Sequence, residues 1–334
     1  MQTFLDEILQ QSQALQDCFA GNDDDVIQAV RQVLHGRPVL MTGMGASFHA
    51  GEIIAYRVQA RQPVRVHQAV DLLNYPAAAL DPDTVVVYVS QSGDSAEVVP
   101  LLDQLDGRHT VIALTNNPDS ALGRRADLTL ALHAGSETTV ATKTYLNTLV
   151  LLHRIAGASR ADLDPCAESI AALLAHADEI TLHWRALFDN HAQLYFLGHG
   201  AHGVTARHVS MMLAEWCKRP SVGMSIGAFR HGFIETIDPA AGVVIFAPHG
   251  RTRASALALA AEIAGYGAQV LIVEHGHTRH LQDDAAANGD DAALRDELLA
   301  PLIDIIPAQL AVAAAASAAG NAGFRYIRKV VTRL

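Results

Sequence analysis

Residues 85–95 read Val85-Val86-Val87-Tyr88-Val89-Ser90-Gln91-Ser92-Gly93-Asp94-Ser95. The five apolar residues at the start of this stretch predict a strand that is buried on both faces. The strand ends in a turn of three serines around Gly93, a residue that lets the backbone approach a ligand closely. Serine hydroxyls and the amides of a following helix N-terminus donate hydrogen bonds to anions, so the stretch predicts a phosphate cradle.

The turn contains no lysine, which distinguishes it from a nucleotide-binding loop with its Gly-Lys-Ser/Thr sequence. We therefore expect a small phosphorylated molecule that is held by neutral donors. Gly43-x-Gly45 alone is a weak signal for a dinucleotide, so we predict no nucleotide cofactor. The histidines and acidic residues form no dense ligand cluster, so we predict no metal either.

Two segments of the chain resemble each other. Residues 39–56 and 194–218 each contain a short apolar strand, a Gly-x-Gly turn and a helical pattern. Further strands are expected at 85–90 and 110–115 in the first copy, and at 243–247 and 269–274 in the second. Strands that alternate with helical stretches indicate βαβ units and a parallel sheet. The predicted fold class is α/β, with two tandem lobes, each a parallel sheet flanked by helices.

These patterns predict four parts. They are N-terminal helices at 1–34, a first lobe at 35–175, a second lobe at 176–319 and a C-terminal tail at 320–334. Ligands of open α/β sheets bind beyond the carboxyl ends of the strands, where we expect the Ser90 turn. At the equivalent position the second lobe has Ala247-Pro248-His249-Gly250, in which proline and alanine remove donors. We therefore expect one phosphate site per chain, in the first lobe.

Composition narrows the classes of partner and compartment. The formal net charge of −11, without a basic cluster, argues against nucleic acid and against an anionic membrane surface. The three cysteines are scattered, so neither a disulfide framework nor a structural zinc site is expected. The N-terminus lacks the form of a signal peptide, and no apolar run is expected to reach membrane-spanning length. A cytoplasmic protein is the expectation.

Five motifs, in this order along the chain, resemble the tandem form of the sugar isomerase (SIS) domain family. They are Gly43-Met44-Gly45-Ala46-Ser47-Phe48-His49-Ala50-Gly51, residues 90–95, Val140-Ala141-Thr142-Lys143-Thr144-Tyr145, Arg230-His231-Gly232 and Lys329-Val330-Val331-Thr332. The resemblance covers residues from about 35 to 334. It is closest to the isomerase half of glucosamine-6-phosphate synthase and to SIS-type glucosamine-6-phosphate deaminases. It implies an enzyme acting on a phosphosugar or amino-sugar phosphate. The synthase also carries a glutaminase domain, for which we expect no room in this chain.

Moving a carbonyl between C1 and C2 of a sugar phosphate needs ring opening, a base and stabilisation of the enediol oxygen. The resemblance assigns Glu215 as the base, His231 as the ring-opening group, and Lys329 as a tail residue that closes over the sugar. It also implies a homodimer with shared active sites, because the family's histidine acts in the neighbouring subunit's site. Leu213 and Trp216 beside Glu215 would partly desolvate the carboxylate and raise its pKa. Judged without the resemblance, Glu215 is as well explained as a solvated helix residue.

The phosphate is assigned to four residues of the turn and two flanking residues that the resemblance implies. They are Ser90, Gln91, Ser92 and Ser95, with Ser47 and Thr142. Serine and threonine also cap helices without any ligand, so both flanking residues keep that alternative. Glu137 and Lys143 bracket the third loop and are expected to form no more than a local ion pair.

The chain departs from the family pattern around the base and the histidine. Pro220-Ser221-Val222 replaces a His-Ala-Glu run, Phe233 replaces a proline, and Met212 stands where the synthase has a lysine. The surroundings of C1 and C2 would thus be less polar, with room for a bulkier substituent. Three functions remain open, of which we favour the first: an isomerase or deaminase acting on an amino-sugar phosphate such as glucosamine 6-phosphate, a deglycase that splits a ketosamine phosphate, and a non-catalytic phosphosugar sensor.

Overall fold

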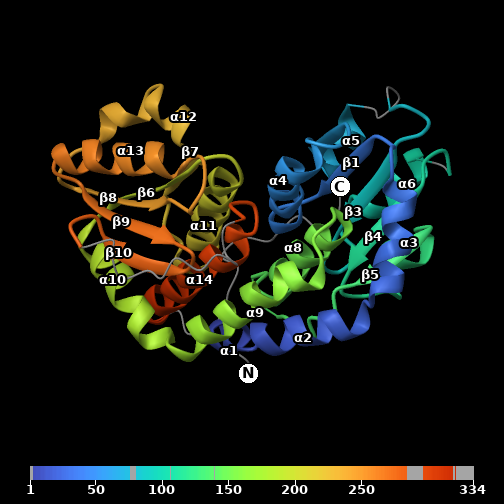
Figure 1. Ribbon diagram of the computed structural model, residues 1–334, viewed down its shortest axis with the longest axis horizontal. Coiled ribbons are helices and arrows are strands. Elements are labelled where there is room, and N and C mark those ends of the chain that lie inside the picture. Colours follow the sequence, from blue (N-terminus) through green and yellow to red (C-terminus); the bar gives the residue numbers. More distant parts are fainter. Residues whose placement is uncertain are drawn as a thin grey trace. The chain divides into compact units, whose positions relative to one another are not determined.

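The computed structural model describes residues 3–75, 80–105, 107–138, 140–283, 296–318 and 320. The chain forms two compact units (Figure 1). The N-terminal unit contains residues 13–160, and the C-terminal unit contains residues 3–12 together with 161–318. The N-terminal helices are therefore shared between the two units.

A five-stranded parallel sheet in the order β2-β1-β3-β4-β5 forms the centre of the N-terminal unit. Its strands are β1 (Val39–Gly43), β2 (Val64–Gln68), β3 (Val85–Val89), β4 (Val111–Thr115) and β5 (Leu128–Ala131). Strand β3 lies in the middle, hydrogen-bonded to β1 and β4, and all five of its residues are buried. The Ser90 turn therefore leaves the centre of the sheet, at the carboxyl ends of the strands.

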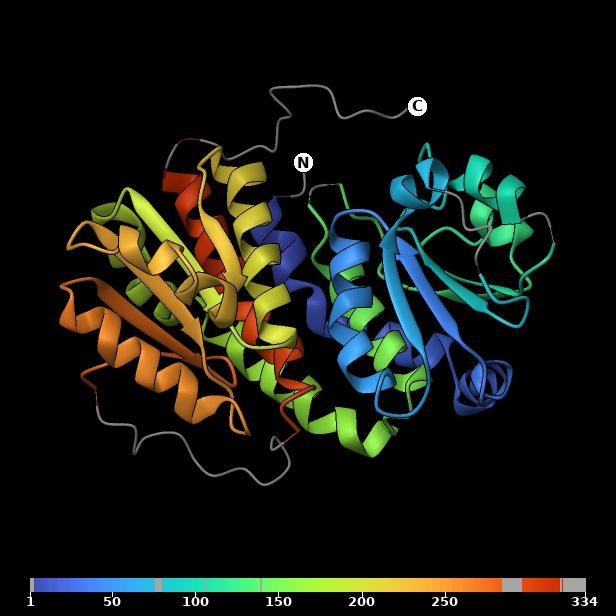
Figure 2. The same ribbon diagram turned by 90° about the horizontal axis from the view of Figure 1, so that it is seen from above.

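Helices cover both faces of this sheet (Figure 2). They are α2 (Gln11–Gly21), α3 (Asp24–Leu34), α4 (Ala46–Val58), α5 (Ala69–Asn74), α6 (Val98–Leu105), α7 (Ala121–Arg125) and α8 (Lys143–Ile155). Helices α5, α6 and α7 pack on the face that carries Leu40, Val86 and Tyr88. Helix α4 lies on the opposite face, over Met41, and packs against α8. Every residue of α8 is buried, so this helix is part of the core of the unit.

The C-terminal unit contains a second five-stranded sheet, in the order β10-β9-β8-β6-β7. Its strands are β6 (Gln193–Gly198), β7 (Val222–Ser225), β8 (Ala241–Phe246), β9 (Gln269–Glu274) and β10 (His277–His280). Its helices are α1 (Phe4–Leu9), α9 (Arg160–Ala175), α10 (Ala177–Asn190), α11 (Ala201–Cys217), α12 (Ile226–Arg230), α13 (Arg253–Gly265), α14 (Ala300–Ala318) and the 3₁₀ turn η2 (Phe233–Thr236). Helices α12 and α13 cover one face, and α10, α11 and α14 pack together on the other.

The two sheets have the same strand order when β1 is matched with β6, β2 with β7, β3 with β8 and β4 with β9. The repeat extends to the backbone of the first turn: Gly45 has φ 52° and ψ −121°, and Gly200 has φ 52° and ψ −123°. Residues that carry a side chain rarely adopt this backbone conformation, which explains the glycine at both positions. The fifth strand breaks the repeat, because β5 is parallel to its neighbour and β10 is antiparallel.

The predicted α/β class with two sheets flanked by helices is confirmed. The first sheet is parallel as expected, whereas the second is mixed, because β10 folds back antiparallel to β9. Strands expected near 39–43, 85–90, 110–115, 194–198, 243–247 and 269–274 are present as β1, β3, β4, β6, β8 and β9. Four strands were not predicted, namely β2, β5, β7 and β10. These strands lie at or next to the sheet edges and are largely half-exposed, so they lack the continuous apolar run of a buried strand.

The expectation that no apolar run reaches membrane-spanning length was wrong for α14. This helix has 19 residues and is long and apolar enough to cross a membrane by length and composition. Most of it is buried inside the C-terminal unit, where it packs against α10 and α11. It also carries Asp304, a buried carboxylate that accepts hydrogen bonds from His202 Nε2 and from the amide of Gly276. Burial in a core explains the apolar composition of α14.

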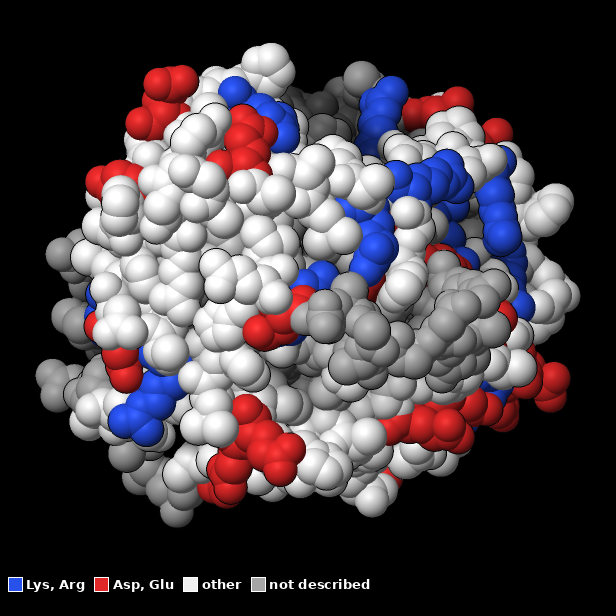
Figure 3. Space-filling model, turned by 60° about the vertical axis from the view of Figure 1, so that its left-hand side comes forward, with Lys and Arg blue, Asp and Glu red and all other residues white. Residues whose placement is uncertain are grey.

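Charged side chains are distributed unevenly over the surface. The chain has 35 acidic and 24 basic residues. On the face drawn in Figure 3, acidic side chains form several separate groups, and Lys and Arg gather mainly on the upper right. On this face the acidic side chains therefore form no single patch, whereas basic side chains gather in one region.

Candidate active site

The Ser90 turn is held in place by the loop that follows β4. The amide of Ser90 donates to Leu114 O at 3.1 Å, and the amide of Asn116 donates to Gln91 O at 3.0 Å. On the other side, the amide of Ala121 donates to the Asp94 carboxylate at 2.8 Å. These bonds use one amide, one backbone carbonyl and one carboxylate of the turn. The turn is therefore anchored at both ends before any ligand binds.

Gly93 is required by the conformation of the turn and by its surroundings. Its φ is +68°, in the left-handed region that favours glycine. A Cβ atom at this position would lie 2.6 Å from Cβ of Ser120 and would overlap the Ser120 hydroxyl. The carbonyl of Gly93 also accepts a hydrogen bond from the amide of Leu122 at 3.0 Å. Glycine thus brings the turn into contact with the start of α7.

The four predicted phosphate residues of the turn differ in accessibility. Ser90 is buried, and its hydroxyl accepts a hydrogen bond from the amide of Gly93 at 3.2 Å and lies 3.5 Å from the hydroxyl of Ser95. Gln91 and Ser92 are exposed, and the Ser92 hydroxyl accepts from the amide of Asp94 at 3.2 Å. Ser90 and Ser95 therefore shape the turn, and Gln91 and Ser92 present their side chains to solvent.

Ser47 lies in the first turn of α4, directly after the Gly43–Gly45 turn. A Cβ atom at Gly43 would come within 2.7 Å of the carbonyl oxygen of Val89, the residue before the Ser90 turn. This close approach places the ends of β1 and β3 side by side, as their pairing requires. Ser47 is half-buried and belongs to the same sheet edge as the Ser90 turn.

Thr142 is fully buried, and its hydroxyl donates to Glu137 Oε1 at 3.0 Å. The amides of Thr142 and Lys143 donate to the same oxygen at 2.9 and 2.8 Å, and the hydroxyl of Thr144 donates to Glu137 Oε2. Glu137 thus satisfies the free amides at the start of α8. Thr142 itself makes no side-chain capping bond. Glu137 was expected to form no more than a local ion pair, because its only signal in the sequence is an acid shortly before a Thr-Lys-Thr helix start; its contact with the amides of α8 was not predicted.

The turn after β8, at residues 247–250, is the C-terminal unit's equivalent of the Ser90 turn, and it is occupied by the carboxylate of Glu297. Glu297 accepts hydrogen bonds from the amide of Arg251 at 3.0 Å and from the hydroxyl of Thr252. The same carboxylate lies directly against Gly250, where a Cβ atom would overlap it. This arrangement supports the expectation of a single phosphate site per chain, because an acidic group lies where a second anion would bind.

Glu215 lies in the last turn of α11, in the C-terminal unit. Its side chain is half-buried. Two neighbours on the same helix, Leu213 and Trp216, are buried, and Trp216 stacks on Phe4 with ring centroids 4.3 Å apart. Burial raises the pKa of the Glu215 carboxyl, and the positive charge of Lys218 partly opposes this shift. A carboxylate whose pKa is raised by burial suits a general base.

His231 directly follows α12 and is exposed. Its backbone amide donates to Ala228 O at 3.2 Å, and no hydrogen bond between its side chain and Glu215 is found in the described part of the chain. Its neighbour Arg230 forms an ion pair with Glu262 at 2.8 Å, which anchors this segment to α13. The imidazole of His231 is thus presented to solvent from an anchored turn.

The predicted site residues fall into two groups. The N-terminal unit brings Ser47 and the Ser90 turn together at the carboxyl ends of its strands. The C-terminal unit carries Glu215 and His231. Lys329 and the rest of the predicted tail after Gly320 lie outside the described residues. Met212, expected to make the sugar site less polar, is buried in the core. Among the described residues, no group of three or more His, Cys, Asp or Glu side chains could hold a metal ion.

Comparison with known proteins places this geometry in a family. The model of the SIS domain matches residues 35–157 and 186–319. The glutamine–fructose-6-phosphate aminotransferase (isomerizing) of Pyrococcus horikoshii is 27% identical over 320 residues, which cover 92% of this chain and 53% of that protein. The chain thus spans about half the length of this relative.

Two solved structures show the same fold. The C-terminal domain of a glucosamine–fructose-6-phosphate aminotransferase from Francisella tularensis matches with a TM-score of 0.79 and 20% identity, over 96% of this chain and 97% of that one. A glucosamine-6-phosphate deaminase from Thermotoga maritima matches with a TM-score of 0.70 and 20% identity, over 96% of this chain and 95% of that one. Since the family model covers well over half of the sequence, in two segments that each hold one sheet, the chain belongs to the SIS domain family.

Proposed function

We propose that this chain is an enzyme that moves the carbonyl of an amino-sugar phosphate between C1 and C2, with glucosamine 6-phosphate as substrate. The observation that carries the proposal is the Ser90 turn, which presents Gln91 and Ser92 at the carboxyl end of a central strand. This is where α/β sheets bind ligands, and neutral donors on a rigid turn suit a phosphate group. The matched relative and the deaminase neighbour are both named for phosphorylated sugars.

In the proposed reaction, the phosphate is held by the Ser90 turn together with Ser47. His231 takes the proton of the C1 hydroxyl and returns it to the ring oxygen, which opens the ring. Glu215 then removes the proton from C2 and delivers a proton to C1, through an enolamine intermediate. The resulting C2 imine is hydrolysed by water, so glucosamine 6-phosphate and water yield fructose 6-phosphate and ammonia.

Two further parts of the proposal concern the assembly and the tail. We assign His231 to the active site of a second copy of the chain, so that a homodimer shares its sites; the exposed imidazole is compatible with this. We assign Lys329 to a closing segment that covers the open-chain sugar. No metal or organic cofactor takes part in the proposed reaction.

The test is a coupled assay that follows ammonia and fructose 6-phosphate together after addition of glucosamine 6-phosphate. Glu215→Gln should lower kcat/KM by about 100-fold or more, the usual contribution of a general base. Glu168→Gln is the matched control, because Glu168 is an exposed glutamate on α9 of the same unit. Equal activity of the two variants would refute the role of Glu215.

A ketosamine-phosphate deglycase is the second candidate, and Phe233 favours it. This side chain lies two residues after His231 and is 44% exposed, although it is large and apolar. An exposed aromatic ring beside the proposed ring-opening group would suit a substrate with an apolar amine substituent. Release of a hexose phosphate and a free amine from a fructosamine 6-phosphate, without turnover of glucosamine 6-phosphate, would establish this activity. Binding of both compounds without turnover of either would instead indicate a sensor.

A further inference from the structure

The N-terminal unit contains a cavity of about 390 Å³ near the amino end of strand β1, opposite to the end of the sheet that carries the Ser90 turn. Three helices end at this cavity, namely α3, α4 and α8, and strand β1 begins there. The Ser90 turn lies at the carboxyl end of the sheet, whereas Val39 in the cavity wall is the first residue of its strand. The cavity is therefore separate from the proposed sugar site.

The inner wall of the cavity is apolar. It is formed by the side chains of Leu34, Val39, Met41, Val58 and Ile155. Two glycines also line the cavity: Gly36, where an added Cβ would meet no atom within 4 Å, and Gly157, where a Cβ would overlap the guanidinium of Arg61. A cavity of this volume with an apolar wall suits a compact ligand with an aromatic or branched aliphatic body.

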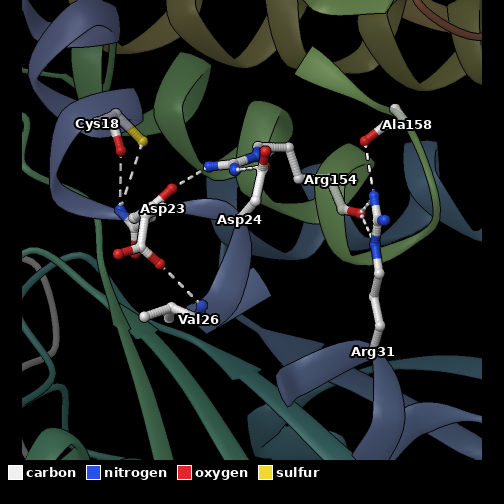
Figure 4. A network of polar contacts seen from close by, with 8 residues as sticks. Cys18, Asp23, Asp24, Val26, Arg31, Arg154 and Ala158 are labelled. Atoms are coloured by element: carbon white, nitrogen blue, oxygen red, sulfur yellow. Dashed lines mark hydrogen bonds and ion pairs between the residues drawn. The ribbon is translucent and has the colours of Figure 1, made fainter. Parts of the chain in front are cut away.

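Arg31 lines the cavity with a fixed guanidinium. Its Nε and Nη2 donate to Arg154 O at 2.8 and 2.6 Å, and Nη2 also donates to Ala158 O at 2.8 Å (Figure 4). The backbone that Arg31 contacts is itself anchored, because Arg154 pairs with Asp24 at 2.7 Å. Arg31 thus neutralises the carbonyls at the end of α8, and its Nη1 still carries free N–H donors.

Arg61 supplies the second guanidinium. Its Nη1 donates to Ala156 O at 3.0 Å. In the described part of the chain, no group accepts a hydrogen bond from Arg31 Nη1 or from Arg61 Nη2. The twelve residues that line the cavity include these two arginines and no acidic residue. Capping of the helix end therefore accounts for only part of the donors that the two guanidinium groups bring to the cavity.

We propose that this cavity binds a small carboxylate with an apolar body. The apolar wall would bury the body, and the free N–H groups of Arg31 and Arg61 would hold the carboxylate. Guanidinium groups bind carboxylates through charge-assisted hydrogen bonds, which favours the anion over a neutral molecule of the same shape. This site is independent of the proposed sugar chemistry.

The test uses 1-naphthylacetate and its neutral amide, 1-naphthylacetamide, with calorimetry on the full chain. The carboxylate should bind at least about 10-fold more tightly than the amide, because only the anion forms charge-assisted bonds. Arg61→Met should reduce the affinity for the carboxylate by about 10-fold. Arg65→Met is the matched control, since Arg65 is an exposed arginine on β2 outside the cavity, and it should change nothing.

Methyl NMR locates the ligand independently of affinity. The methyl signals of Met41, Val58 and Ile155 should shift on titration with 1-naphthylacetate, and Val58→Phe, which fills the cavity, should abolish binding of both probes. Equal affinity for acid and amide, equal effects of the two arginine variants, or shifts confined to other methyl groups would overturn the proposal.

Discussion

Burial changes the acid–base behaviour of Glu215 and His153 in opposite directions. Loss of water disfavours the charged form of either group, which raises the pKa of a carboxyl and lowers the pKa of an imidazole. Glu215 is half-buried at the end of α11, and its pKa is raised. His153 lies fully buried in α8, where burial and the charge of Arg57 lower its pKa to about 3.

Lys218→Met should move the acid limb of the kcat/KM profile to higher pH. The positive charge of Lys218 now lowers the pKa of Glu215, so its loss leaves the effect of burial unopposed. A base must be deprotonated to act, and activity should therefore appear only at higher pH in the variant. The measurement is the pH dependence of kcat/KM at low ionic strength. An unchanged acid limb would show that Glu215 does not control it.

His153→Leu should stabilise the protein, and most strongly in acid. Among the described residues, neither ring nitrogen of His153 has a hydrogen-bond partner, and the residue is completely buried. The unfolded chain binds a proton near pH 6.5 and the folded chain only near pH 3, so stability falls as pH drops through this window. The free energy of unfolding falls by roughly 4 kcal/mol between neutral pH and pH 3 because of His153.

Urea denaturation of wild type and His153→Leu at several pH values measures this effect. The difference in free energy of unfolding between His153→Leu and the wild type should increase as pH falls from 7 to 4. His67→Leu is the control, because His67 is an exposed histidine on β2 of the same unit, and its denaturation midpoint should follow that of the wild type. A gap that stays constant with pH would mean that His153 titrates normally in the folded chain.

At the scale of elements, the ends of helices and strands determine what the N-terminal unit can bind. The Ser90 turn joins β3 to α6, the Gly43–Gly45 turn joins β1 to α4, and Glu137 occupies the start of α8. Of these three connections, the one before α8 already holds an anionic group, and the other two carry the hydroxyl groups of the proposed phosphate site. The Ser90 turn depends on a single glycine for its geometry.

Gly93→Ala should destabilise the chain more than Gly107→Ala, by about 2 kcal/mol. Both glycines have a positive φ, +68° and +64°, so an alanine at either position introduces similar backbone strain. Only Gly93 is crowded, by Ser120, whereas a Cβ at Gly107 would meet nothing within 4 Å. Thermal unfolding compares the two variants, and calorimetry with glucosamine 6-phosphate should show weakened binding in Gly93→Ala alone. Equal stability would mean that α7 moves away from the turn freely.

At the scale of the whole molecule, the chain repeats one sheet topology but has diversified the two copies. The N-terminal unit keeps an open serine turn, and the C-terminal unit fills the equivalent turn with Glu297. The proposed base and the proposed ring-opening histidine both belong to the C-terminal unit. In the proposed reaction, a complete site would take residues from both units, and from a second copy of the chain if His231 acts in the partner's site.

Coexpression of Glu215→Gln and His231→Asn chains tests the shared site. Each variant alone should be inactive, but half of the dimers in a random mixture contain both chains, and each such dimer has one site with both groups intact. The mixture should therefore recover about a quarter of the wild-type activity. No recovery in a mixture whose hybrid dimers are verified by differential tags would place Glu215 and His231 in the same chain's site.

Much of the fold follows from local sequence patterns. Central strands such as β3 and β8 are buried on both faces, so their apolar runs are unambiguous, and the Gly-x-Gly turns mark where each copy begins. Edge strands such as β2 and β10 are half-exposed and carry polar residues, so their sequences resemble loops. The serine turn was predictable for the same reason as β3, because the turn residues directly follow the strand.

By itself, the sequence determined the α/β class, the repeat and the position of the serine turn, since each depends on residues that are adjacent in the chain. Only the tertiary structure decided which polar groups are free. Glu137 and Glu297 accept hydrogen bonds from amides and hydroxyls that the sequence around each glutamate does not identify. His153 is shielded from water by the residues packed around it. The cavity between Arg31 and Arg61 likewise exists only because three helices end at one place. Such contacts join residues that are distant in sequence, so no local pattern encodes them.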